Sequence, residues 1–155
     1  MPRAPGQVRA VTPTATVSPT QSADFACAYA VEIRPGDGRS SEQWARVAWE
    51  GASAPMRWFI VAGWRFVLGL RLGPRNSPDY ILGWQIVERR PDETVCRLQS
   101  WFLHAYNTFR LDGGRLVWST LVVYERPIAR LVWPPVSLLH RPMVRIALRR
   151  ASMRA

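Results

Sequence analysis

The sequence predicts a single α+β domain in which an antiparallel sheet packs against helices. Its hydrophobic pattern begins with one strand and two helices, continues as strands with a period of two, and ends in a long helical stretch. Of the 155 residues, 48% are hydrophobic. A domain of this size buries about two-thirds of its unfolded surface, so it needs no disulfide or metal to hold its core.

The first strand and the first helix are marked by their boundaries. Residues Phe25–Ile33 are mostly aromatic and small apolar residues, and a Pro-Gly turn follows them. Ser40 and Gln43 have the spacing of a capping box, in which each side chain bonds to the backbone of the other residue. Trp44 and Val47 then follow at helical spacing. The sequence therefore predicts a strand over 25–33 and a helix that begins after Ser40.

A second helix is predicted from Pro55 to about Leu70. Proline suits the first turn of a helix, and glycines and prolines follow the predicted end. This stretch is the most hydrophobic of the chain, but its longest run without a charge is the seven residues Trp58–Trp64. Spanning a bilayer takes about 20 apolar residues, so no transmembrane helix is predicted.

The middle of the chain predicts an antiparallel meander. Residues Tyr80–Glu88 and Thr94–Ser100 form one hairpin, and Asp112–Gly114 is a strong turn signal before the clear strand Arg115–Glu125. The stretch Trp101–Leu111 either continues the preceding strand through a bend or forms a new one.

The last segment, Pro127–Ala155, has a helical pattern that we expect to be broken by Pro134 and Pro135 and strained at Pro142. At 100° per residue, one apolar arc should cover the sheet. Its members are Val136, Leu139, Met143, Ile146 and Ala147.

All 21 basic residues of the chain are Arg, and the net charge is +10. Arg141, Arg145 and Arg149 lie opposite the apolar arc of the last helix, where we expect them to be solvated. Such charge attracts polyanions, so an Arg-driven binder of nucleic acid or of an anionic membrane is one alternative function. Nucleic acid is nevertheless not the expected partner.

Residues 1–23 are predicted to be a disordered tail, which leaves 24–155 as the domain. The tail has four Pro, four Thr and no acidic residue, and it lacks the apolar run of roughly 7–15 residues that a secretory signal needs. With no signal and only Cys27 and Cys96 as cysteines, a cytoplasmic location is expected.

The stretches YILGWQIVERRPDETVCRLQS and VYERPIARLVWPPVSLLHRPMVRIALRR, and the order of the elements, resemble the START-like (SRPBCC, helix-grip) superfamily. Within it, the likeness is to small bacterial proteins similar to polyketide cyclase/dehydrase-like proteins, over roughly 24–154. The resemblance implies a curved antiparallel sheet around the C-terminal helix, with two short helices after the first strand and a hydrophobic cavity between sheet and helix. Seven strands are usual there, and five or six are recognisable here. It carries no catalytic residue across.

The candidate site follows from strand register. If Gly113 and Gly114 form a two-residue turn, Asn107 lies opposite Thr120 on the more apolar face of the sheet, and a three-residue loop would unpair them. This face lines either a pocket or a filled core in which the two polar side chains satisfy each other. The candidate ligand-binding residues are Trp84, Ser100, Asn107, Trp118, Thr120, Tyr124 and His140.

The expected function is binding of an unidentified hydrophobic or amphipathic small molecule between the sheet and the C-terminal helix. An enzyme of cyclase or dehydratase type, using His140, Asn107 or Tyr124, is an alternative on the same scaffold. No catalytic residue is predicted, because nucleophile elbows and metalloprotease motifs are absent. No metal or other cofactor is expected either. The chain has only two cysteines and two histidines, and Ser41 replaces the third glycine of a dinucleotide loop.

Overall fold

The computed structural model describes residues 6–13, 23–74 and 76–154. The helices are α1 (Ser41–Glu50), α2 (Ala54–Ala62), the π-helical turn η1 (Gly63–Val67) and α3 (Ala129–Met153). The strands are β1 (Val8–Val11), β2 (Phe25–Glu32), β3 (Tyr80–Ile81), β4 (Trp84–Arg89), β5 (Glu93–Gln99), β6 (Leu103–Asp112) and β7 (Arg115–Tyr124).

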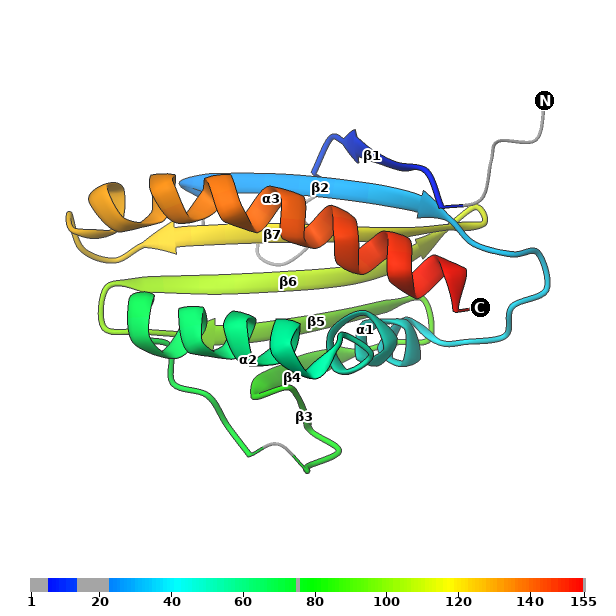
Figure 1. The fold of residues 1–155 in the computed structure, drawn as a ribbon, viewed down its shortest axis with the longest axis horizontal. Coiled ribbons are helices and arrows are strands. Elements are labelled where there is room, and N and C mark those ends of the chain that lie inside the picture. Colours follow the sequence, from blue (N-terminus) through cyan, green and yellow to red (C-terminus); the bar gives the residue numbers. More distant parts are fainter. Residues whose placement is uncertain (1–5, 14–22, 75, 155) are drawn as a thin grey trace.

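Within the described residues, these strands form one antiparallel sheet in the order β1-β2-β7-β6-β5-β4-β3. The helices lie on one face of it, with the long α3 crossing β2 and β7 (Figure 1). The predicted α+β class is therefore confirmed, and the arrangement is consistent with a helix-grip fold.

Strand β1 lies in the segment that the sequence predicts as a tail. Val8 pairs with Val31, and Val11 pairs with Ala28, so β1 extends the sheet beyond β2. For these residues the predicted disorder is wrong. Four residues give no periodic pattern to recognise, and the free edge of β2 supplies the backbone partners that make them a strand. The remainder of the predicted tail, 1–5 and 14–22, lies outside the described residues.

The turn between β6 and β7 has the predicted two-residue form. Gly113 and Gly114 have φ values of +55° and +79°, which suit glycine and the twist of a tight hairpin. Asn107 consequently pairs with Thr120, as predicted. The stretch before it is a new strand, β6, rather than a continuation of β5.

Two strand and helix boundaries differ from expectation. The predicted strand Tyr80–Glu88 is interrupted at Leu82 and Gly83, whose φ values of +47° and +90° make a turn between β3 and β4. The predicted second helix ends earlier, because α2 widens into η1 and the helical path stops at Val67. Turns of this π type are frequent at functional sites.

Helix α3 is continuous through its three prolines, so the predicted break is wrong. Each proline lacks a donor, but a buried row holds the helix on the sheet on both sides of them. This row is also rotated from the predicted apolar arc, since Leu139 and Ile146 are exposed. Its members are Ala129, Trp133, Ser137, Val144, Leu148, Ala151 and Ser152.

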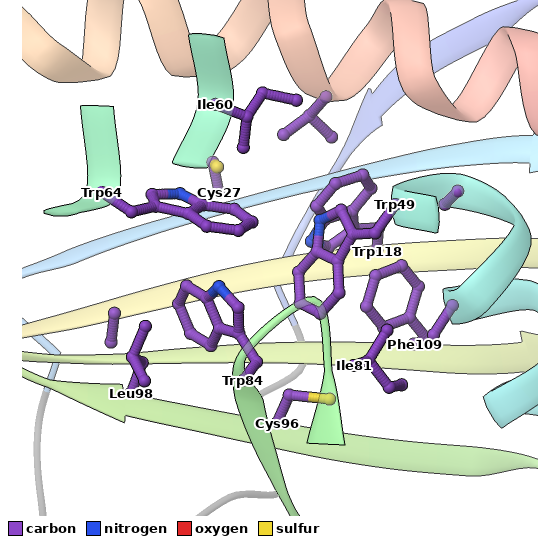
Figure 2. Packing of buried hydrophobic residues seen from close by; sticks show 14 of the residues in the cluster. Cys27, Trp49, Ile60, Trp64, Ile81, Trp84, Cys96, Leu98, Phe109 and Trp118 are labelled. Atoms are coloured by element: carbon purple, nitrogen blue, oxygen red, sulfur yellow. The ribbon is translucent and has the colours of Figure 1, made fainter. Parts of the chain in front are cut away.

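The core is centred on Trp49 of α1. Its ring centroid lies 5.5 Å from that of Trp84, 5.6 Å from that of Trp118 and 5.1 Å from that of Phe109 (Figure 2). The ring of Trp64 from η1 lies 5.8 Å away. Aromatic rings from two helices and three strands thus meet at one point, and a cavity begins beside them.

Candidate functional site

A cavity of about 480 Å³ lies between the sheet and the segments α2, η1 and α3. Its volume is within the range of small-molecule sites, roughly 300–1,000 Å³. Eight of its lining residues are large aromatic ones: Trp49, Trp58, Phe59, Trp64, Phe66, Trp84, Trp118 and Trp133. The remaining apolar lining comes largely from α2, η1 and α3, and includes Val136, Leu139, Met143 and Ala147. Most of the predicted apolar arc of α3 therefore faces this cavity rather than the sheet.

Three neutral polar side chains, from β6, β7 and α3, interrupt the apolar lining: Asn107, Thr120 and His140. Asn107 Oδ1 accepts hydrogen bonds from Trp118 Nε1 and from Thr120 Oγ1, both at 2.7 Å. An indole nitrogen can only donate, so this contact sets which end of the amide is the oxygen. Asn107 Nδ2 is then left without an acceptor among the described residues.

His140 completes this polar cluster. Its Nε2 lies 3.4 Å from Thr120 Oγ1, and the only hydrogen of that hydroxyl goes to Asn107. The Thr120 oxygen therefore accepts from a protonated Nε2, which leaves Nδ1 with a lone pair. Nδ1 is buried and has no partner among the described residues. Burial, and to a smaller extent the positive charge of Arg141, lowers the pKa of His140 to about 4, so the ring is neutral at pH 7.

Two other lining residues have buried donors without a partner. These are the indole nitrogens of Trp84 and Trp133, for which no acceptor is present within the described part of the chain. Neither indole nitrogen is accessible from the cavity, so the unpaired donor that a guest can reach is Asn107 Nδ2. A donor that loses its water on ligand binding needs a new acceptor, so the cavity favours a guest that brings an oxygen to Asn107 Nδ2.

Five of the seven predicted site residues line the cavity: Trp84, Asn107, Trp118, Thr120 and His140. For the other two, the predicted place on the cavity wall is wrong. Ser100 Oγ accepts from the backbone N–H groups of Phe102 and Leu103, and so holds the turn before β6. Tyr124 is half-buried at the end of β7, at the edge of the core. Strand alternation placed both on the correct face, but it does not tell how far the cavity extends along a strand.

The mouth of the cavity is made by residues that the sequence analysis did not propose. Five side chains line the cavity and are also exposed: Trp58, Phe59, Phe66, Val67 and Leu139. The most exposed are Trp58 (74%) and Phe66 (79%). We refer to these five residues as the mouth rim. The excess of apolar residues in 54–70 was the signal that could have found the four rim residues of α2 and η1, whereas Leu139 belongs to the predicted apolar arc of the last helix.

The chemistry available in the cavity is limited. Among the described lining residues, His140 is the only titratable one, and none is a carboxylate or an arginine. His104 has Glu125 at 3.5 Å, but neither of these two lines the cavity. No group of three or more metal-ligating side chains occurs in the described ranges.

None of the described helices combines the length and the apolar character that crossing a bilayer requires.

No protein-family model matches the chain, and no match is found among curated proteins. Among solved structures, the chain is similar to an uncharacterized protein from Rhizobium leguminosarum, at 15% sequence identity and a TM-score of 0.42. The similarity covers 86% of this chain and 98% of that one. Neither finding assigns a family or a ligand to this chain.

Proposed function

We propose that the protein binds a hydrophobic small molecule with one uncharged polar group, in the cavity between the sheet and α3. The observation that carries this proposal is the cavity itself, about 480 Å³, walled by aromatic rings around one polar cluster. Mostly apolar walls with a few placed polar groups are typical of sites for small organic ligands. A START-like protein, which the sequence resembles, would use the same place.

The absence of charge from the described lining residues restricts the ligand class. A carboxylate or ammonium group in the cavity would lose its hydration without gaining a counter-charge, and this costs several kcal/mol. The neutral state of His140 at pH 7 adds no charge. We therefore expect an uncharged ligand, such as a polycyclic or long-chain ketone, alcohol or ester.

The polar cluster indicates how the ligand is oriented. Asn107 Nδ2 lacks an acceptor, while its Oδ1 is fixed by Trp118 and Thr120. We expect the ligand oxygen to accept a hydrogen bond from Nδ2, with the apolar body against Trp84 and Trp118. A net contribution of about 1 kcal/mol is usual for such a bond, roughly a fivefold preference over the matching hydrocarbon.

The first experiment fills the cavity and leaves the fold unchanged. Ala147 lines the cavity from α3, and we expect Ala147→Phe to weaken binding of N-phenyl-1-naphthylamine, an uncharged fluorescent probe, at least tenfold. Leu138→Phe is the matched control, because Leu138 is on the same helix, is exposed and does not line the cavity. Equal loss in both variants, or no binding by the natural chain, would contradict the proposal.

The second experiment tests the polar anchor. The natural chain should bind 2-acetylnaphthalene about fivefold more tightly than 2-ethylnaphthalene, since the two differ mainly in one carbonyl oxygen. Asn107→Leu should abolish this preference, measured by displacement of the same fluorescent probe. If the preference survives the substitution, the carbonyl is recognised elsewhere in the cavity and the assigned role of Asn107 is wrong.

A further inference from the structure

We propose that the mouth rim docks on the surface of an anionic lipid bilayer, so that the cavity opens toward the lipid. The proposal concerns an interaction surface, and it does not depend on which molecule the cavity holds. It rests on three observations: the exposure of the rim, the weak anchoring of the helix that bears it, and the distribution of charge around it.

The rim is a group of exposed apolar side chains around one opening. Trp58, Phe59, Phe66 and Val67 come from α2 and η1, and Leu139 faces them from α3 (the two helices lie over the same face of the sheet in Figure 1). Exposed apolar patches that surround a cavity mark interaction sites far more often than single exposed side chains do. Trp and Phe are also the residues that insert at membrane interfaces.

The helix that bears most of the rim packs little against the fold. Of its described residues, α2 buries only Ile60, and η1 buries only Trp64. A helix that is apolar on nearly all sides is normally buried. Here Met56 and Val61 pack against the core, but Trp58, Phe59, Phe66 and Val67 are exposed, which indicates a further apolar environment.

Charge selects an anionic partner for this surface. Residues 51–78, which include α2 and η1, contain Arg57, Arg65 and Arg71 among their basic residues and no acid. Residues 126–155, which include α3, contain seven Arg and no acid; two of these, Arg141 and Arg145, lie over the rings of Phe25 and Tyr29 on β2 and not at the mouth rim. Arg65 is exposed between two aromatic neighbours, as expected of a cation placed at the headgroup level.

The same charges disfavour the other occupants. A second copy that met this surface face to face would bring the exposed Arg65 of one copy toward that of the other with no acid from 51–78 between them, and like charges repel. A single-stranded nucleic acid would use aromatic side chains for stacking, but Val67 and Leu139 offer it no stacking surface. An anionic bilayer accepts both kinds of group, apolar side chains below the headgroups and Arg among them.

The test measures binding of the full chain to vesicles of pure phosphatidylcholine and to vesicles with 30% phosphatidylglycerol, by flotation. We expect strong partition into the anionic vesicles and little into the neutral ones. Trp58→Ser combined with Phe66→Ser should lower this partition at least tenfold. Met153→Ser, another exposed apolar residue near the end of α3, should lower it less than twofold.

A charge variant separates docking from binding in the cavity. Arg65 does not line the cavity, so Arg65→Glu should reduce partition into anionic vesicles about tenfold while binding of N-phenyl-1-naphthylamine in solution stays unchanged. Arg34→Glu carries the same change of charge on the exposed loop after β2 and should have less than a twofold effect.

Three results would overturn the proposal. One is equal loss of vesicle binding in the Arg65→Glu and Arg34→Glu variants, which would indicate general attraction by net charge. Another is a dimer of the natural chain that the Trp58→Ser and Phe66→Ser pair dissociates, which would make a second copy the partner. The third is displacement from vesicles by a single-stranded oligonucleotide at lower concentration than the lipid. Loss of probe binding without loss of docking would instead refute only the proposed function.

Discussion

Helices α1 and α2 follow each other in the chain and lie on the same face of the same sheet, yet they are held in different ways. α1 begins with a complete capping box between Ser40 and Gln43, and on its surface Arg46 pairs with both Glu42 and Glu50. Its buried side includes Trp44 and Trp49. α2 has no side-chain cap at Ser53 and buries one residue, Ile60.

The difference separates two uses of apolar side chains. In α1, the apolar residues face the sheet and the core and most polar ones face water, so the helix serves mainly the stability of the fold. In α2 and η1, the exposed aromatic residues Trp58, Phe59 and Phe66 point to the cavity and to solvent, where they add little to folding, and only Trp64 packs in the core. Residues that a protein keeps exposed at such a place are better explained by what they contact outside the chain.

The largest expected effect compares Trp49 with Phe66. Trp49→Ala should lower the free energy of unfolding by about 3–5 kcal/mol, because it removes the buried ring that four other aromatic residues contact. Phe66→Ala should change it by less than about 0.5 kcal/mol, because that side chain is 79% exposed. Urea unfolding measures both. A large loss in the Phe66 variant would mean that η1 is as firmly part of the core as α1.

A smaller effect concerns His140, which lines the cavity together with the aromatic residues of α2 and η1. Its pKa is about 4 in the folded chain and ordinarily 6.5, so the unfolded chain binds the proton first. The stability due to neutral His140 is complete above about pH 6.5 and is lost as the pH falls toward 4, by about 3 kcal/mol at most. His140→Gln should make stability less dependent on pH in this window. Parallel curves for both chains would show that the ring is not desolvated.

The smallest expected effect compares the two helix caps. Ser40→Ala should cost about 1 kcal/mol, since Ser40 Oγ accepts from the N–H of Gln43. Ser53→Ala should cost close to nothing, because the Ser53 side chain makes no capping bond. Thermal unfolding of both variants checks this. Equal costs would indicate that the Ser53 side chain also caps the start of α2.

The sequence predicted best where local chemistry determines the backbone. Gly113 and Gly114 set the turn, the turn sets the register, and the register places Asn107, Trp118 and Thr120 on one face. The capping box likewise predicted the start of α1. Such features depend on a few neighbouring residues, so a single sequence contains them.

Long-range features were predicted less well. The predicted orientation of α3 was wrong, since Leu139 is exposed and does not pack on the sheet. An amphipathic pattern does not distinguish a side that packs on a sheet from one that faces a cavity. The mouth rim was missed for the same reason, since hydrophobicity marks Phe66 as apolar but not as uncovered. Ser100 and Tyr124 were assigned to the site because alternation fixes a face and not a depth.

Strand β1 has a consequence for the colloidal behaviour of the protein. β2 is a mostly buried strand, and without β1 its outer row of backbone N–H and C=O groups would be free to pair with another molecule. The opposite border of the sheet ends in β3, which at two residues is too short a template for such pairing. A chain that lacks Val8–Val11 should therefore self-associate through β2 and scatter light at concentrations where the full chain does not. We therefore expect these four residues to keep the edge of β2 from pairing with other molecules.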